Sequence, residues 1–142
     1  MAQVELVQFI PQTGRYLIYY PKNYELHEDD DSIVTISAND GNSTMTISGY
    51  EVEGEADAAV IEQFLSDITS SYEILSEPKI GEFGEGIRIE ATYIKDDNKW
   101  IWKIFSLGNA IVVVSINSEE ELSPEQLGLY EFMLQNMEVH PD

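Results

Sequence analysis

The chain has 142 residues and a formal charge of −20, because 27 Asp and Glu outnumber 7 Lys and Arg. Its length and its 43% hydrophobic content predict a single folded domain that spans residues 1–142. Such a negative surface repels phosphate, which argues against nucleic acids and anionic membranes and favours basic protein surfaces or cations as partners. Solubility alone is an equally good explanation of the charge.

The absence of cysteine narrows the chemistry. It excludes thiol catalysis, disulfides and thiolate metal ligands. The first residues lack the basic start and apolar core of a signal peptide, and no segment reaches the roughly 20 apolar residues that span a bilayer. We expect a cytoplasmic protein that does not enter a membrane, with an export signal trimmed from the sequence as the alternative.

The first part of the chain predicts β-structure. A short lead over residues 1–13 precedes a strand at 15–20, which Pro21 ends because proline cannot donate to a strand ladder. The polar residues 27–31 predict a loop.

A hairpin and a helix come next. Two β-rich runs, 33–38 and 44–50, flank residues 39–42, in which Asp-Gly favours a tight turn. A helix is predicted over 56–69, where apolar residues recur with helical period. That apolar stripe consists of Val60, Ile61, Phe64, Leu65 and Ile68.

The middle of the chain predicts further antiparallel strands. Two short strands, 72–75 and 80–83, are separated by Pro78. Longer strands are predicted at 87–93, 99–107 and 110–116, joined by turns at 96–98 and 108–109. The last of these strands is almost continuously apolar and β-branched, which predicts a central strand with both faces covered.

The last helix has the clearest start signal. Ser123 is a capping residue, Pro124 occupies the first helical position, and Gln126 stands at the capping-box position. Its apolar residues cover more than one face of the helix. We therefore expect this helix to be deeply buried or to touch a second surface, for example in an oligomer. These apolar residues are Leu127, Leu129, Tyr130, Phe132, Met133, Leu134 and Met137.

The order of elements predicts an α+β fold, an α/β sandwich. A central antiparallel sheet of about six to seven strands would carry two main helices. The segment 14–24, with Tyr20-Pro21 followed by Tyr24, resembles the opening strand of small Mog1/PsbP-like domains, and 130–137 is similar to their closing helix. The resemblance implies binding of proteins or a role in assembly. It transfers no functional residue, and the basic surfaces that some members use are missing here.

No catalytic constellation stands out. The only conventional bases are His27 and His140, and neither has neighbours typical of a catalytic site, so we expect no enzyme. The acidic run 27–31 lacks the glycine and the spacing of a calcium loop, and residues 81–86 lack the Lys of a phosphate loop. We therefore expect no metal and no cofactor. Glu90 could face a cleft, but the solvated face of an amphipathic strand is favoured.

Aromatic and acidic residues are the candidate binding groups. Trp100 and Trp102 share one strand face, as do Tyr16 and Tyr20, and such residues occur both at binding hot spots and in cores. The largest acidic excess lies in residues 51–98. Its candidate contact charges are Glu51, Glu53, Glu55, Glu82 and Glu85.

Two hypotheses follow. The first is a non-enzymatic protein-binding domain for a basic partner, in one form an acidic immunity or inhibitor protein. The second is a small-ligand or cation-binding module with an aromatic-lined cleft.

Overall fold

The computed structural model describes residues 5–38 and 43–141, which contain ten strands and two helices. In chain order these are β1 (Leu6–Phe9), β2 (Tyr16–Pro21), β3 (Glu25–Glu28), β4 (Val34–Ser37), β5 (Ser43–Glu51), α1 (Ala58–Ile68), β6 (Glu73–Phe83), β7 (Gly86–Lys95), β8 (Asn98–Leu107), β9 (Ala110–Ser118), α2 (Pro124–Gln135) and β10 (Glu138–Val139).

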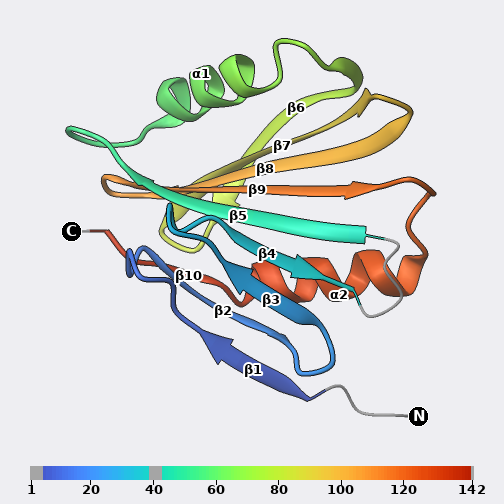
Figure 1. Cartoon of the computed structure of the whole chain (residues 1–142). Helices are drawn as coiled ribbons and strands as arrows, with labels where there is room; N and C mark the ends of the chain where they lie inside the picture. Colours follow the sequence, from blue (N-terminus) through green and yellow to red (C-terminus); the bar gives the residue numbers. More distant parts are fainter. Residues whose placement is uncertain (1–4, 39–42, 142) are drawn as a thin grey trace.

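Seven strands form one antiparallel sheet in the order β3-β4-β5-β9-β8-β7-β6. Figure 1 shows α1 on one face of this sheet and α2 on the other, where the smaller sheet β1-β2-β10 also lies. The α+β architecture, with seven strands in the main sheet and a helix on each face, confirms the sequence-based prediction of the fold.

The strand β9 is the centre of the sheet and of both cores. Because side chains alternate along a strand, Val112 and Val114 face α2, whereas Ile111 and Val113 face α1. All four side chains are at most 4% exposed. The prediction of a central strand covered on both faces is confirmed.

Both helices begin at side-chain caps. Asp57 caps α1 by accepting a hydrogen bond from the Val60 amide at 3.0 Å, and Ser123 caps α2 by accepting from the Gln126 amide at 3.1 Å. In a capping box, the Gln126 side chain would bond back to the Ser123 amide. Here it instead donates a hydrogen bond to the Tyr24 hydroxyl at 2.8 Å.

The helix α2 buries one side and exposes another. Tyr130, Met133 and Leu134 are buried, whereas Phe132 is 49% exposed. This helix therefore does not bury all its apolar residues against the sheet, and oligomerisation through it stays a prediction.

Several strand predictions were wrong. β1 and β10 were missed, and with β2 they form a separate sheet; β3 occupies part of the predicted loop 27–31. The two strands predicted at 72–75 and 80–83 are instead one strand, β6, which begins at Glu73. Pro78 is tolerated within β6 because this is an edge strand whose register shifts on both sides of Ser76. The predicted turn at 39–42 lies outside the described residues.

Candidate functional site

The five candidate glutamates gather at one end of the main sheet. Glu51 pairs with Ala110 where β5 ends and β9 begins, and the β6–β7 hairpin reaches the same end because Ile87 pairs with Ser106 near the close of β8. The loop after β5 is fixed there by a hydrogen bond from the Ala56 amide to the Gly108 carbonyl at 2.8 Å. We call this surface the acidic end; it comprises Glu51, Glu53, Glu55, Glu82 and Glu85.

Glu51 differs from the other four glutamates because it is engaged within the fold. Its carboxylate accepts hydrogen bonds from the Arg15 guanidinium and, at 3.3 Å, from the Asn109 amide. These contacts connect β5 to the segment that opens β2. The exposed charges available to a partner at the acidic end are therefore mainly Glu53, Glu55, Glu82 and Glu85.

Trp100 and Trp102 lie side by side on the α1 face of β8. Their rings are stacked with centroids 6.1 Å apart, and Tyr72 packs edge-on against both at 5.5 and 5.9 Å. Burial raises the pKa of Tyr72, and the ammonium of Lys95 lies 4.6 Å from the centre of its ring. The two tryptophans are thus half-buried members of an aromatic cluster.

Tyr16 and Tyr20 belong to the packing on the α2 face. Tyr16 is fully buried, and Tyr20 is partly buried against the same core. Burial, together with the negative charge of Glu28, raises the pKa of Tyr16. Its side chain therefore packs in the interior and does not reach the surface.

A cleft of about 540 Å³, lined by both apolar and polar side chains, separates α1 from β6 and β7. We call it the α1 cleft. Two of its lining residues, Ile74 and Ile80, are 52% and 45% exposed, and their neighbour Leu75 is 47% exposed. The cleft is lined by Glu62, Leu65, Ser66, Thr69, Ser70, Tyr72, Ile74, Glu77, Pro78, Ile80, Ile89 and Tyr93. Sequence reasoning missed this surface, because a proline such as Pro78 predicts a break in the strand where β6 forms one wall of the cleft.

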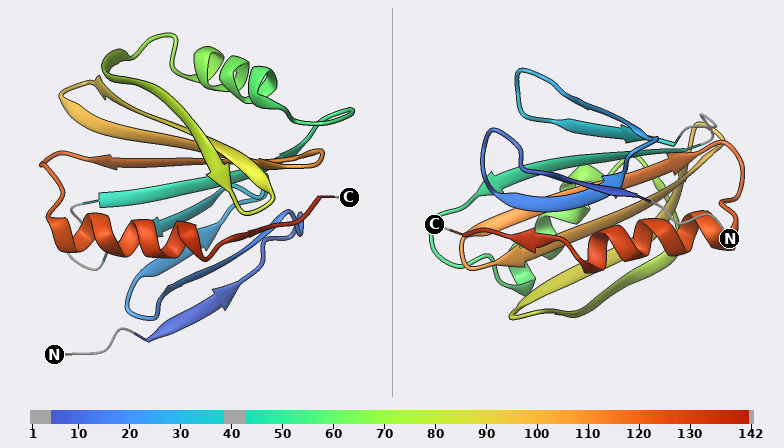
Figure 2. Two further views of the ribbon diagram at one scale, coloured as in Figure 1. Left: turned by 180° about the vertical axis from the view of Figure 1, so that it is seen from behind. Right: turned by 90° about the horizontal axis from the view of Figure 1, so that it is seen from below.

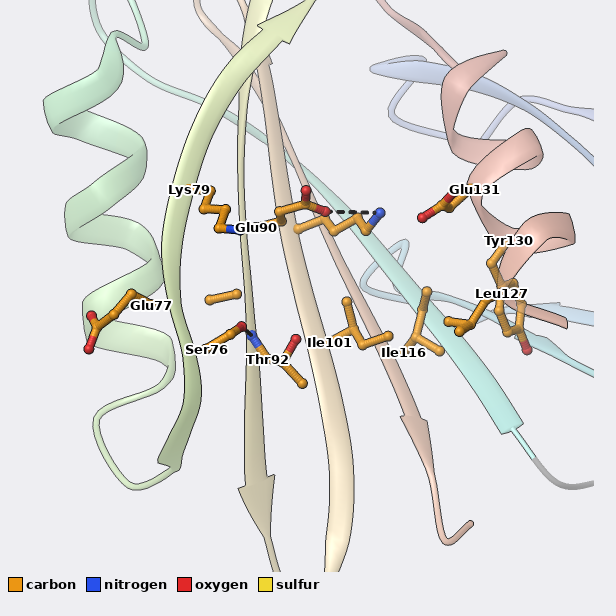
Figure 3. Close-up of a pocket in the computed structure, with 12 residues that line it drawn as sticks. Ser76, Glu77, Lys79, Glu90, Thr92, Ile101, Ile116, Leu127, Tyr130 and Glu131 are labelled. Carbon is orange, nitrogen blue, oxygen red and sulfur yellow. Dashed lines mark hydrogen bonds and ion pairs between the residues drawn. The ribbon is translucent and has the colours of Figure 1, made fainter. Parts of the chain in front are cut away.

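A second opening, which we call the α2 groove, lies on the other face between α2 and strands β6 to β8 (Figure 3). Three adjoining cavities of about 100, 270 and 170 Å³ form it, and they share lining residues. It is lined by Ser76, Glu77, Lys79, Phe83, Arg88, Glu90, Ala91, Thr92, Lys99, Ile101, Lys103, Phe105, Ile116, Ser118, Glu121, Leu122, Leu127, Tyr130, Glu131, Leu134 and Gln135.

An ion pair lies at the floor of the α2 groove. Glu90 Oε2 is 3.2 Å from Lys103 Nζ, and the side chain of Lys103 is only 9% exposed. The solvated strand face favoured for Glu90 describes it only in part, because its side chain is 35% exposed and its carboxylate pairs with the buried Lys103. The sequence signal for this ion pair was a lysine, Lys103, flanked by apolar residues within a strand. Its partner Glu90 can be identified only from the β7–β8 register.

The two histidines lie in different parts of the fold. His27 is exposed in β3, and His140 Nε2 is 3.4 Å from Glu138. Across residues 5–38 and 43–141, no three His, Asp or Glu side chains gather closely enough to hold a metal ion. Within the same residues, neither helix has the length and apolar character needed to cross a bilayer.

Comparison with known proteins identifies the fold. No family model and no curated protein matches the sequence. Similar solved structures include cyanobacterial PsbP (CyanoP) from Synechocystis sp. PCC 6803, with a TM-score of 0.70 and 10% identity over 99% of this chain and 95% of that one. They also include the Ran-binding protein Mog1p from Saccharomyces cerevisiae, with a TM-score of 0.61 and 13% identity over 98% and 97%.

A third similar structure comes from Bacteroides thetaiotaomicron VPI-5482, with a TM-score of 0.66 and 14% identity. It aligns with 95% of this chain, which spans only 48% of the Bacteroides chain. The chain therefore has the Mog1/PsbP-like fold, as the resemblance of segments 14–24 and 130–137 predicted. Identities this low establish the fold alone.

Proposed function

We propose that this chain is a non-enzymatic protein-binding domain that docks a basic partner along β6. One observation carries the proposal. The exposed edge strand β6 lines the α1 cleft over its first residues and reaches the acidic end with its last residues. Figure 2 (left) shows β6, in yellow-green, with α1 and α2 on either side of the sheet. An apolar surface and an acidic surface are therefore continuous.

The apolar part of this surface would supply most of the binding free energy. Ile74, Leu75 and Ile80 are each about half exposed, although side chains of this size are usually buried. Contiguous exposed apolar residues with a polar rim commonly mark interaction sites. Here the rim carries Glu62 and Glu77.

The acidic part would select the partner. A segment with apolar anchors flanked by Lys or Arg complements both the cleft and its glutamate rim. The structurally similar protein Mog1p binds the protein Ran, which supports a protein-binding role for this chain. It does not identify the partner. In its most specific form, the proposal is an acidic immunity or inhibitor protein that covers the basic surface of a toxin.

The test compares capture of partners by two matched variants. Ile80→Ser removes an apolar contact in the cleft, whereas Ile10→Ser removes an equally exposed isoleucine elsewhere, the two being 45% and 48% exposed. We expect crosslinking in a lysate of the source organism to recover a basic protein with the parent and with Ile10→Ser but not with Ile80→Ser. Equal recovery by both variants would remove the cleft from the proposal.

The dimensions of the α1 cleft favour one second candidate, a small cationic ligand. Its volume of about 540 Å³ is in the range of ligand sites, and it combines Tyr72 and Tyr93 with the carboxylates of Glu62 and Glu77. Choline is a suitable probe, because the fluorescence of the nearby Trp100 and Trp102 would report its binding. A choline response that Ile80→Ser abolishes, without any captured protein, would favour this candidate.

A further inference from the structure

We propose that the α2 groove binds a small monocarboxylic acid with an apolar body, whose carboxylate is held by Arg88 and Lys103. This inference concerns the face opposite the α1 cleft and does not depend on the proposed function. It begins with an uneven distribution of charge: the sequence has only seven Lys and Arg, yet four of them line this one groove. They are Lys79, Arg88, Lys99 and Lys103.

The first argument is the position of the Lys103 ammonium. Its side chain is nine-tenths buried, yet it lines two of the cavities of the groove. The ammonium has three donors, and among the described residues its ion-pair partner is Glu90, whose Oε2 lies 3.2 Å from Nζ. A carboxylate that enters the groove would give this ammonium a further acceptor.

The second argument is Arg88, which lines the same 100 Å³ cavity as Lys103. Within residues 5–38 and 43–141, no carboxylate forms an ion pair with its guanidinium. Arg88 lies opposite Gly81 in the β6–β7 pairing, and a Cβ added at that glycine would be in ordinary van der Waals contact with Arg88 Nε, at 3.5 Å. A planar guanidinium binds a carboxylate with two parallel hydrogen bonds, and an ammonium beside it adds a third.

The pairing of charges in the groove favours a monoanion. Its four cations face four carboxylates, and two ion pairs are formed, Lys103–Glu90 and Lys99–Glu121. Within residues 5–38 and 43–141, Arg88 takes part in no ion pair, so one carboxylate can bind it. A phosphate dianion would bring a second negative charge close to Glu131. The overall charge of −20 does not prevent this, because salt screens distant charges beyond about 8 Å.

The shape of the groove defines the rest of the ligand. A cavity of about 100 Å³ has room for roughly three waters and therefore for a carboxylate group. It adjoins the 270 Å³ cavity, which in turn shares the apolar side chains of Ile101, Ile116 and Leu127 with the 170 Å³ cavity. A ligand with its acid group at Arg88 and an aliphatic or aromatic body along these residues would match both ends.

The test uses octanoate as the probe and octanol as its uncharged counterpart. In titrations of the full chain followed by backbone amide NMR at physiological salt, we expect octanoate to shift the signals of Arg88, Lys103 and Ile101. We expect octanol to bind at least about tenfold more weakly, since it lacks the charge that Arg88 and Lys103 recognise. Inorganic phosphate should leave these signals unchanged.

Two charge-matched variants decide the assignment. Arg88→Gln should weaken octanoate binding by about tenfold or more, whereas Lys22→Gln, which removes an equal charge at a site 72% exposed, should leave it unchanged. Equal binding by both variants would overturn the proposal. So would octanoate shifts that map to the α1 cleft and vanish in Ile80→Ser, because the acid would then occupy the other face.

Lys103 needs a separate design, because removing it alone leaves the partly buried Glu90 without its ion-pair partner. The double variant Glu90→Gln with Lys103→Met keeps the pair neutral. If circular dichroism shows that it is folded, loss of octanoate binding supports the assignment and retained binding overturns the part given to Lys103. If it does not fold, the comparison of Arg88→Gln with Lys22→Gln still decides the proposal.

Discussion

The two faces of the main sheet are covered to different degrees. Among the described residues, eighteen buried hydrophobic residues form the core on the α2 face, where the small sheet, β4 and β5 contribute beside the helix. Nine form the core on the α1 face, which has only the helix and the strands beneath it. A more thinly covered face leaves more apolar surface open, and the half-exposed isoleucines of β6 lie on that face.

The edge strand β6 contributes to two different openings. Ile74 and Ile80 line the α1 cleft, whereas Lys79 lines the α2 groove. Strict alternation of side chains does not hold along the whole strand, because its register shifts on both sides of Ser76. One opening combines exposed isoleucines with carboxylates, and the other holds cations around the Glu90–Lys103 ion pair. The two surfaces would therefore select different ligands.

The largest expected effect compares two isoleucines on the α1 face. Ile61, a residue of α1, is fully buried, whereas Ile74 is 52% exposed on β6. We expect Ile61→Ala to lower the free energy of unfolding by about 3 kcal/mol, through lost burial and the cavity left behind. Ile74→Ala should change it by less than about 0.5 kcal/mol. Urea unfolding measures both, and similar losses would mean that β6 is covered in solution.

The sequence predicted those parts of the fold that local patterns determine. The apolar run of β9, the cap at Ser123 and the tight turn at Asp96–Asp97, with φ of 54° and 65°, each depend on neighbouring residues. The short strands were missed because their pairing is distant: β10 has two residues and pairs with Tyr16 and Leu17, more than a hundred positions earlier. No local signal specifies such a contact.

The candidate site was predictable only in part, for the same reason. The glutamates of the acidic end could be named from the charge excess, but their convergence required the register of β5, β7, β8 and β9. The α2 groove required the position of the last helix as well. Lys103 and Glu90 are thirteen residues apart, and only their cross-strand pairing shows that a buried lysine faces a carboxylate.

The next effect tests the α2 face with two buried tyrosines. The Tyr130 hydroxyl lies 2.6 Å from Ser43 Oγ, whereas the Tyr16 hydroxyl has no hydrogen-bond partner in the described residues. Tyr130→Phe should lower the free energy of unfolding by about 1–2 kcal/mol, because it leaves a buried Ser43 unpaired. Tyr16→Phe should leave stability unchanged or raise it by about 1 kcal/mol. Equal losses in urea unfolding would contradict this contrast.

Alkaline pH probes the same core. Burial raises the pKa of Tyr16 above its ordinary value of 10.0, so the folded chain keeps a proton that the unfolded chain loses. This contribution to stability is fully present below pH 10 and is lost as the pH rises further. The free energy of unfolding should fall by about 1.4 kcal/mol per pH unit above that point, and Tyr16→Phe should remove this part of the slope. An unchanged slope in the variant would show that another group causes it.

A smaller effect is expected where α2 begins. Ser123→Ala removes the oxygen that accepts from the Gln126 amide and should lower the free energy of unfolding by about 1 kcal/mol. Ser66→Ala, on the exposed side of α1, is a suitable control because alanine favours helix interiors. An unchanged denaturation midpoint for Ser123→Ala would show that α2 does not depend on this cap.

The smallest effect on stability, and the most direct test of the electrostatic proposal, concerns the two ends of the sheet. Glu82→Gln with Glu85→Gln removes two of the charges of the acidic end, while Glu119→Gln with Glu120→Gln makes the same charge change after β9, at the opposite end. With a captured partner, the first pair should slow association at low salt by on the order of tenfold and hardly change dissociation. The second pair should slow association less, because its charges lie at the opposite end of the sheet from the proposed contact and attraction weakens with distance. If both double variants associate at the parent rate in low salt, the charge serves solubility, and the aromatic strand of Trp100 and Trp102 becomes the next surface to vary.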